Sequence, residues 1–79
     1  MTEAEKHAKR RLKEAINYVS RHWGNGFNIL SDSQRQALVR AEMLADISRI
    51  SSVDTDPEVY KAMVSAMADA AVQWEGTVS

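Results

Sequence analysis

The chain has 79 residues, a formal net charge of −1 and no cysteine. This length fits one domain, and the lack of cysteine excludes disulfide bonds and thiolate zinc sites. No apolar run is long enough to span a bilayer, and the charged first residues differ from the apolar core of a signal peptide. We therefore expect a single helical domain over residues 1–79, located in the cytoplasm, with a frayed C-terminal tail.

The charges are divided unevenly along the chain. Residues 1–24 hold six Lys or Arg against three Glu, a net +3. Residues 25–79 hold four Lys or Arg against eight Asp or Glu, a net −4. The sequence therefore predicts a basic first segment and an acidic remainder.

The first predicted helix spans about residues 3–23. Thr2 and Glu5 form a capping box at its start, and Gly24 suits the left-handed residue just past its end. Small and apolar residues recur on one face as far as Trp23, which we expect to be buried. The opposite face is predicted to be a basic surface turned toward a partner, made of Lys6, Lys9, Arg10, Lys13 and Arg21.

Residues 25–30 connect the first predicted helix to the second. Phe27, Ile29 and Leu30 are too apolar for a bare surface loop. We expect these three side chains to close one end of the hydrophobic core.

The second predicted helix spans about residues 32–50 and starts with a capping box of Ser31 and Gln34. Its polar stripe is narrow and consists of Arg35, Glu42, Asp46 and Arg49. Two apolar groups remain on its circumference. The first, which we expect to face the other helices, is Leu38, Ala41, Leu44 and Ala45. The second, on roughly the opposite side, is Val39, Met43, Ile47 and Ile50.

A layer of three helices cannot cover both sides of this helix, and an uncovered apolar group would leave a sizeable patch in water. We therefore expect a homodimer whose interface is Val39, Met43, Ile47 and Ile50. The alternative is a compact bundle in which the other two helices wrap round this helix and cover both groups.

The third predicted helix spans about residues 57–75. Asp56 is placed to cap its start, and Pro57 suits the first helical position, where a backbone N–H has no partner within the helix. A broad apolar face ends at Trp74, which we expect to be buried like Trp23.

Residue types that carry catalysis or bind metals are present without the spacing they need. His7 and His22 lie at opposite ends of the first predicted helix, so they cannot share a site within one chain. The acidic residues Asp54, Asp56 and Glu58 lack the glycine and spacing of a calcium loop and are better explained as helix caps. We therefore predict no enzyme activity, no metal site and no cofactor.

The sequence thus predicts an all-α fold, a small three-helix bundle completed by homo-oligomerisation. We expect a non-catalytic accessory or regulatory protein that acts through protein–protein interaction. Two alternatives stay open. The basic face could bind nucleic acid, although it lacks surface aromatic residues that stack on bases, or the chain could be a structural subunit of a larger assembly. The alanine-rich apolar face of the first helix argues against a membrane surface.

Overall fold

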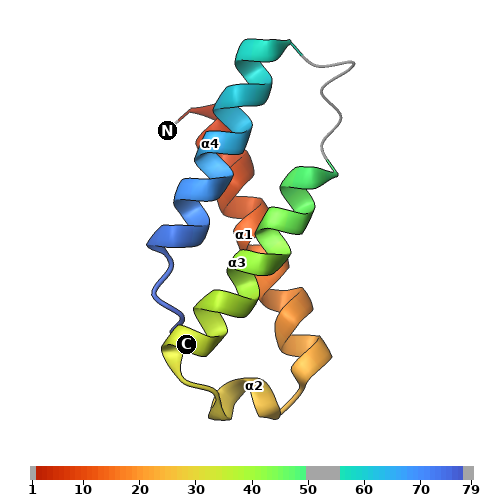
Figure 1. Ribbon diagram of the computed structural model, residues 1–79, viewed down its shortest axis with the longest axis vertical. Coiled ribbons are helices and arrows are strands. Elements are labelled where there is room, and N and C mark those ends of the chain that lie inside the picture. Colours follow the sequence, from red (N-terminus) through yellow and green to blue (C-terminus); the bar gives the residue numbers. More distant parts are fainter. Residues whose placement is uncertain (1, 50–55, 78–79) are drawn as a thin grey trace.

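The computed structural model describes residues 2–49 and 56–77. These residues form four helices: α1 (Glu3–Trp23), α2 (Gly26–Ile29), α3 (Asp32–Ser48) and α4 (Pro57–Gln73). The three long helices run side by side, and the short α2 crosses one end of the bundle between α1 and α3 (Figure 1). The prediction of an all-α bundle is confirmed, with α2 as an addition inside the predicted connector.

The helices begin where the sequence signals predict. The hydroxyl of Thr2 accepts from the backbone N–H of Glu5 at 3.2 Å, and the carboxylate of Glu5 accepts from the N–H of Thr2 at 3.4 Å. Ser31 and Gln34 form the same reciprocal pair at the start of α3, with distances of 3.2 and 2.9 Å. Asp56 caps α4 by accepting from a backbone N–H at 2.9 Å. Because each cap satisfies a donor that has no partner within the helix, these ends are fixed locally.

The C-terminal ends of the helices agree with the predictions less well than their starts do. The helix predicted over 32–50 ends at Ser48, and the one predicted over 57–75 ends at Gln73. α1 ends at Trp23 as predicted, and Gly24 follows with a positive φ of 58°.

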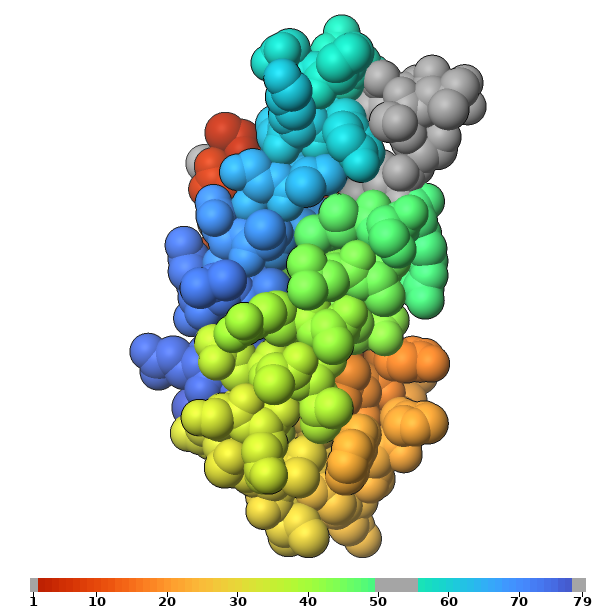
Figure 2. Space-filling view, viewed as in Figure 1, coloured from red at the N-terminus to blue at the C-terminus, as the bar shows by residue number. Residues whose placement is uncertain are grey.

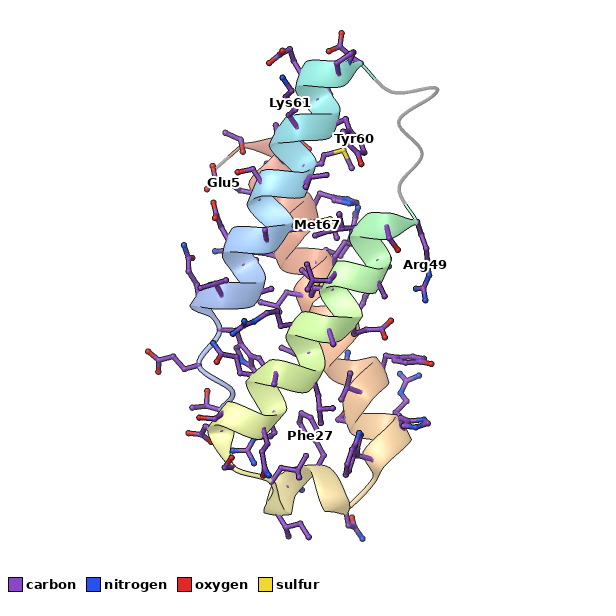
Figure 3. The ribbon with its side chains drawn as sticks, viewed as in Figure 1. Glu5, Phe27, Arg49, Tyr60, Lys61 and Met67 are labelled. Atoms are coloured by element: carbon purple, nitrogen blue, oxygen red, sulfur yellow. The ribbon has the colours of Figure 1, made fainter. Side chains whose placement is uncertain are left out.

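The hydrophobic core lies between α1, α3 and α4. Phe27 of α2 lies at one end of the bundle and Met67 of α4 toward its middle, and both are almost fully buried (Figure 3). α1 contributes mainly small buried residues, which lets α3 and α4 approach it closely. The buried hydrophobic residues are Ala8, Ala15, Val19, Phe27, Val39, Met43, Met67 and Ala71. The side chains of α3 and α4 lie against one another on the face seen in Figure 2.

The predicted division of α3 into two faces is wrong. Val39 and Met43, expected to form an interface with a second copy, have no exposed surface within a single chain. Ile47 is half-buried against the same core, and Ile50 lies outside the described residues. Leu44, expected inside, is 54% exposed. A second copy has no access to Val39 or Met43, so the reason for expecting a dimer no longer holds.

The cause of this error is Arg35, which was predicted to lie on the polar stripe of this helix. Arg35, Val39 and Met43 are four residues apart and share one side of α3. All three are buried, and Arg35 is only 6% exposed. The buried side of α3 therefore begins with an arginine. A prediction based only on the positions of apolar residues does not include Arg35 in this side.

The end of the core is closed by fewer residues than expected. Phe27 is buried and Leu30 is half-buried, as predicted, but Ile29 is 86% exposed. Trp23 is 45% exposed, so its predicted burial is wrong, whereas Trp74 is half-buried against the core. Trp23 is the last residue of α1, where the chain turns toward α2 and Phe27 takes the position at the core.

The segment after α4 is an extended C-terminal strap, residues 74–77, that runs back to the start of α3 (Figure 1). Gln36 donates from its side-chain amide to the carbonyl of Trp74 at 2.8 Å, and Arg35 donates from Nε to the carbonyl of Gly76 at 2.6 Å. Gly76 is buried with φ of 85°, and a Cβ at this position would collide with the backbone carbonyl of Asp32. The strap is therefore fitted closely onto α3.

Candidate functional site

The side chain with the most hydrogen bonds among the described residues is Arg35, at the junction of α2, α3 and the strap. Its ring of acceptors consists of the backbone carbonyls of Phe27, Asn28, Leu30 and Gly76 and the carboxylate of Asp32. The guanidinium also lies 6.0 Å from the centre of the Phe27 ring. Each guanidinium nitrogen already donates to a protein oxygen, so the geometry gives Arg35 a structural role rather than a binding one.

A second ionic group joins α1 to α3. Arg11 contacts both carboxylate oxygens of Asp46, through Nε and one terminal nitrogen, each at 2.6 Å. The other terminal nitrogen lies 2.5 Å from Glu14. These hydrogen bonds hold the pKa of Asp46 below its usual range and raise the pKa of Arg11, while partial burial opposes both shifts. Asp46 is thus an ionised carboxylate that links the two helices.

The residue types considered for catalysis and metal binding are not brought together. His7 lies beside Arg10, with 3.2 Å between the histidine Nδ1 and the guanidinium, and His22 lies at the far end of α1. Asp56 caps α4, and Asp54 is outside the described residues. Across residues 2–49 and 56–77, no three His, Asp or Glu side chains are grouped to hold a metal ion.

The predicted basic surface lies on the outside of α1. All five of its residues are exposed: Lys6, Lys9, Arg10, Lys13 and Arg21. Lys6 is 3.5 Å from Glu3, whereas among the described residues the other four have no carboxylate within ion-pair distance. Two glutamates of α1 that could have paired with them are engaged elsewhere, Glu5 with Thr2 and Glu14 with Arg11. We call these five residues the basic face.

A hollow that was not predicted from the sequence adjoins the basic face. It lies between the second half of α1, α2 and the strap and has a volume of about 560 Å³. Its inner residues are Phe27, which is buried, and Ile16 and Trp74, which are half-buried. Lys13 and Arg21 of the basic face form its exposed edge. We call it the Trp74 hollow.

Apolar side chains also line a groove between α1 and α3. Tyr18 is 61% exposed and borders a hollow of about 290 Å³. Trp23 is 45% exposed and borders both this hollow and a neighbouring one of about 340 Å³. α1 therefore carries two exposed aromatic residues, although the basic face itself has none. Tyr18 and Trp23 face the α3 side of α1, so they lie beside the basic face and not within it.

No helix in the described part of the chain is long and apolar enough to cross a membrane. No protein-family profile, curated protein or solved structure matches this chain. The function is therefore inferred from its surfaces.

Proposed function

We propose that this protein is a small non-catalytic accessory or regulatory protein that binds an acidic surface of a larger protein through the basic face of α1. The observation that carries the proposal is the set of exposed cations Lys9, Arg10, Lys13 and Arg21, which have no carboxylate partner among the described residues. Unpaired charges of one sign on one side of a molecule attract a partner of opposite charge and increase its rate of association. If the chain is instead a structural subunit of a larger assembly, we expect it to contact the neighbouring subunit through the same basic face.

The surroundings of the basic face favour a protein partner over a nucleic acid. Lys9 lines a hollow together with Glu5 and Asp69, and Lys6 is paired with Glu3. The phosphates of a nucleic acid follow one another at a short, fixed spacing, so some of them would lie against these carboxylates. A protein surface carries both signs of charge and can match a mixed pattern.

Nucleic-acid binding remains the second candidate because Tyr18 and Trp23 are exposed next to the basic face. Exposed aromatic side chains beside cations are the usual elements of single-strand binding. The two candidate functions predict tighter binding of different probes, an acidic polypeptide or a nucleic acid, so one titration distinguishes them.

The test is a fluorescence anisotropy titration with labelled polyglutamate, duplex DNA and single-stranded RNA at about 0.15 M salt, where charges further apart than about 8 Å are largely screened. The variant Lys9→Glu/Arg10→Glu reverses two charges on the basic face. The matched control Arg40→Glu/Lys61→Glu makes the same two changes at exposed positions of α3 and α4.

We expect polyglutamate to bind the unmodified protein and the control variant, and binding to be lost in Lys9→Glu/Arg10→Glu. Equal loss in both variants would refute a specific basic face. Tighter binding of DNA or RNA than of polyglutamate would favour the second candidate.

A further inference from the structure

The Trp74 hollow is assembled from three segments that contacts within the fold hold in place. Trp74 is held by the hydrogen bond from Gln36 to its carbonyl at 2.8 Å. Phe27 is buried in the core, and its carbonyl accepts from Arg35 at 3.3 Å. The hollow is therefore formed before any ligand arrives, which lowers the entropic cost of binding.

The hollow combines apolar side chains inside it with a cationic edge, and uncharged polar residues, among them Asn17, Ser20 and Asn28, also line it. Among the described residues that line it, the charged ones are Lys13 and Arg21, and neither has a carboxylate within ion-pair distance. A purely anionic ligand would leave the exposed apolar surfaces of Ile16 and Trp74 unused. A purely apolar ligand would leave the two cations unpaired. The lining therefore fits a ligand that carries an apolar group between anionic groups.

The spacing of the two cations indicates where those anionic groups should be. Lys13 and Arg21 are eight residues apart on α1, which is about 12 Å along the helix axis. Residues four apart in an extended peptide are separated by about 13 Å. In such a peptide the residues two before and two after a central side chain project from the same face as that side chain. Carboxylates at those two positions can reach Lys13 and Arg21 while the central side chain enters the hollow.

We infer that the Trp74 hollow binds an extended acidic segment of a partner protein, in which a bulky apolar residue is flanked by carboxylates two positions away on each side. The apolar side chain contacts Trp74 and Ile16, and the carboxylates pair with Lys13 and Arg21. This inference rests on the proposed function and specifies what the basic face recognises.

The test uses four short peptides, acetylated and amidated at their ends. The matching peptide is Glu-Ser-Phe-Ser-Glu. Gln-Ser-Phe-Ser-Gln removes the charges, Glu-Ser-Gly-Ser-Glu removes the apolar group, and Ser-Glu-Phe-Glu-Ser moves the carboxylates to the other face of the strand. Each is titrated into ¹⁵N-labelled protein and followed by two-dimensional NMR.

The two tryptophan indole N–H groups report on separate surfaces, because Trp74 lines this hollow and Trp23 lines the groove between α1 and α3. We expect Glu-Ser-Phe-Ser-Glu to shift the Trp74 indole signal and the amide of Asn28, and to leave the Trp23 indole unchanged. Each of the other three peptides should bind about tenfold more weakly, a loss within the range expected when two exposed ion pairs or one apolar anchor are removed.

Variants of the protein test whether Lys13 and Arg21 bind the peptide or only stabilise the fold. Lys13→Glu/Arg21→Glu should weaken binding of the matching peptide by about tenfold or more, while Arg40→Glu/Lys61→Glu should not change it. Thermal unfolding of each variant confirms that it is folded. Asn17→Trp, which keeps both cations and places a large side chain in the hollow, should also weaken binding.

Several results would overturn the inference. If Glu-Ser-Gly-Ser-Glu binds as tightly as the matching peptide, the hollow is not used, although the proposed function of the basic face would stand. If the Trp23 indole shifts instead of the Trp74 indole, the groove between α1 and α3 is the binding site. If Gln-Ser-Phe-Ser-Gln binds equally well, the charges of Lys13 and Arg21 play no part in binding at the hollow and the inference is wrong, whereas the proposed function is decided separately by the polyglutamate titration of Lys9→Glu/Arg10→Glu. If none of the four peptides shifts a signal, the inference is wrong.

Discussion

Arg35 donates from its Nε to the backbone carbonyl of Gly76, 2.6 Å away and 41 positions later in the chain. This contact joins the start of α3 to the strap that follows α4. The same guanidinium also binds the carbonyls of the connector, so one side chain holds three segments at the end of the bundle. The Trp74 hollow lies at this end, and its shape therefore depends on Arg35.

Replacing Arg35 should be costly. In Arg35→Met, buried carbonyls lose their donor, and we expect a loss of about 2–4 kcal/mol in the free energy of unfolding. Arg35→Lys should recover only part of this, because an ammonium cannot reproduce the planar fork. The measurement is urea denaturation, with the exposed Arg40→Met as the control. Equal stability of Arg35→Met and Arg40→Met would show that the contacts of Arg35 contribute nothing.

The strap should be sensitive to a single methyl group at Gly76. Gly76→Ala combines a positive φ of 85° with a collision against the carbonyl of Asp32, and we expect a cost of about 2–4 kcal/mol. Gly24→Ala is a matched control, since Gly24 has a φ of 58° but no atom within 4 Å of the added methyl group. Gly24→Ala strains only the backbone (φ 58°, ψ −136°) and should cost less than Gly76→Ala, about 1–2 kcal/mol. Thermal unfolding measures the stability of both variants. Equal losses in the free energy of unfolding would mean that the strap moves to accommodate the methyl group at no extra cost.

The core assignment of α3 can be tested with two neighbouring residues. Met43 is fully buried and Leu44 is 54% exposed. Met43→Ala should therefore cost about 2–5 kcal/mol, and Leu44→Ala less than about 1 kcal/mol. Denaturant unfolding measures both. The opposite order would restore the assignment made from the sequence, with Met43 on an outer face.

Much of the fold could be predicted because its signals are local. The capping pairs Thr2–Glu5 and Ser31–Gln34 lie within one turn of helix, so they mark where α1 and α3 begin without reference to the rest of the chain. The inner face of α3 could not be predicted in the same way. Its orientation depends on the acceptors that surround Arg35, and these come from the connector and the strap.

The candidate site shows the same difference between features set within one helix and features that depend on distant segments. The exposed positions of the basic face follow from the periodicity of one helix, and the prediction that they contact a partner remains to be tested. The Trp74 hollow was missed because its lining comes from α1, α2 and the strap, and no local pattern shows that they meet. The apolar residues Phe27 and Trp74 lie near chain turns in the sequence, but both were assigned to the core and not to a surface hollow.

The link between Arg11 and Asp46 should make stability depend on pH. The pKa of Asp46 is lowered in the folded chain by the hydrogen bonds from Arg11. Its contribution is therefore fully present above the unfolded value of about 4 and is lost as the pH falls through the lower, folded value. Asp46→Asn should destabilise the protein at pH 7 and have a diminishing effect as the pH falls below about 4.

A double-mutant cycle provides the control for this pair. In an Arg11→Gln background, Asp46→Asn should have almost no further effect on the free energy of unfolding at neutral pH, because its partner is already absent. An undiminished effect would mean that Asp46 acts through another group.

The most direct test of the proposed function is the ratio of two dissociation constants for the same acidic probe. One is measured for Lys9→Glu/Arg10→Glu and the other for Arg40→Glu/Lys61→Glu, two variants with the same net charge. If the basic face binds acidic protein surfaces, the first dissociation constant should be at least about tenfold larger than the second. A ratio of about one would contradict the proposal, since binding would then follow the total charge of the molecule and not its distribution.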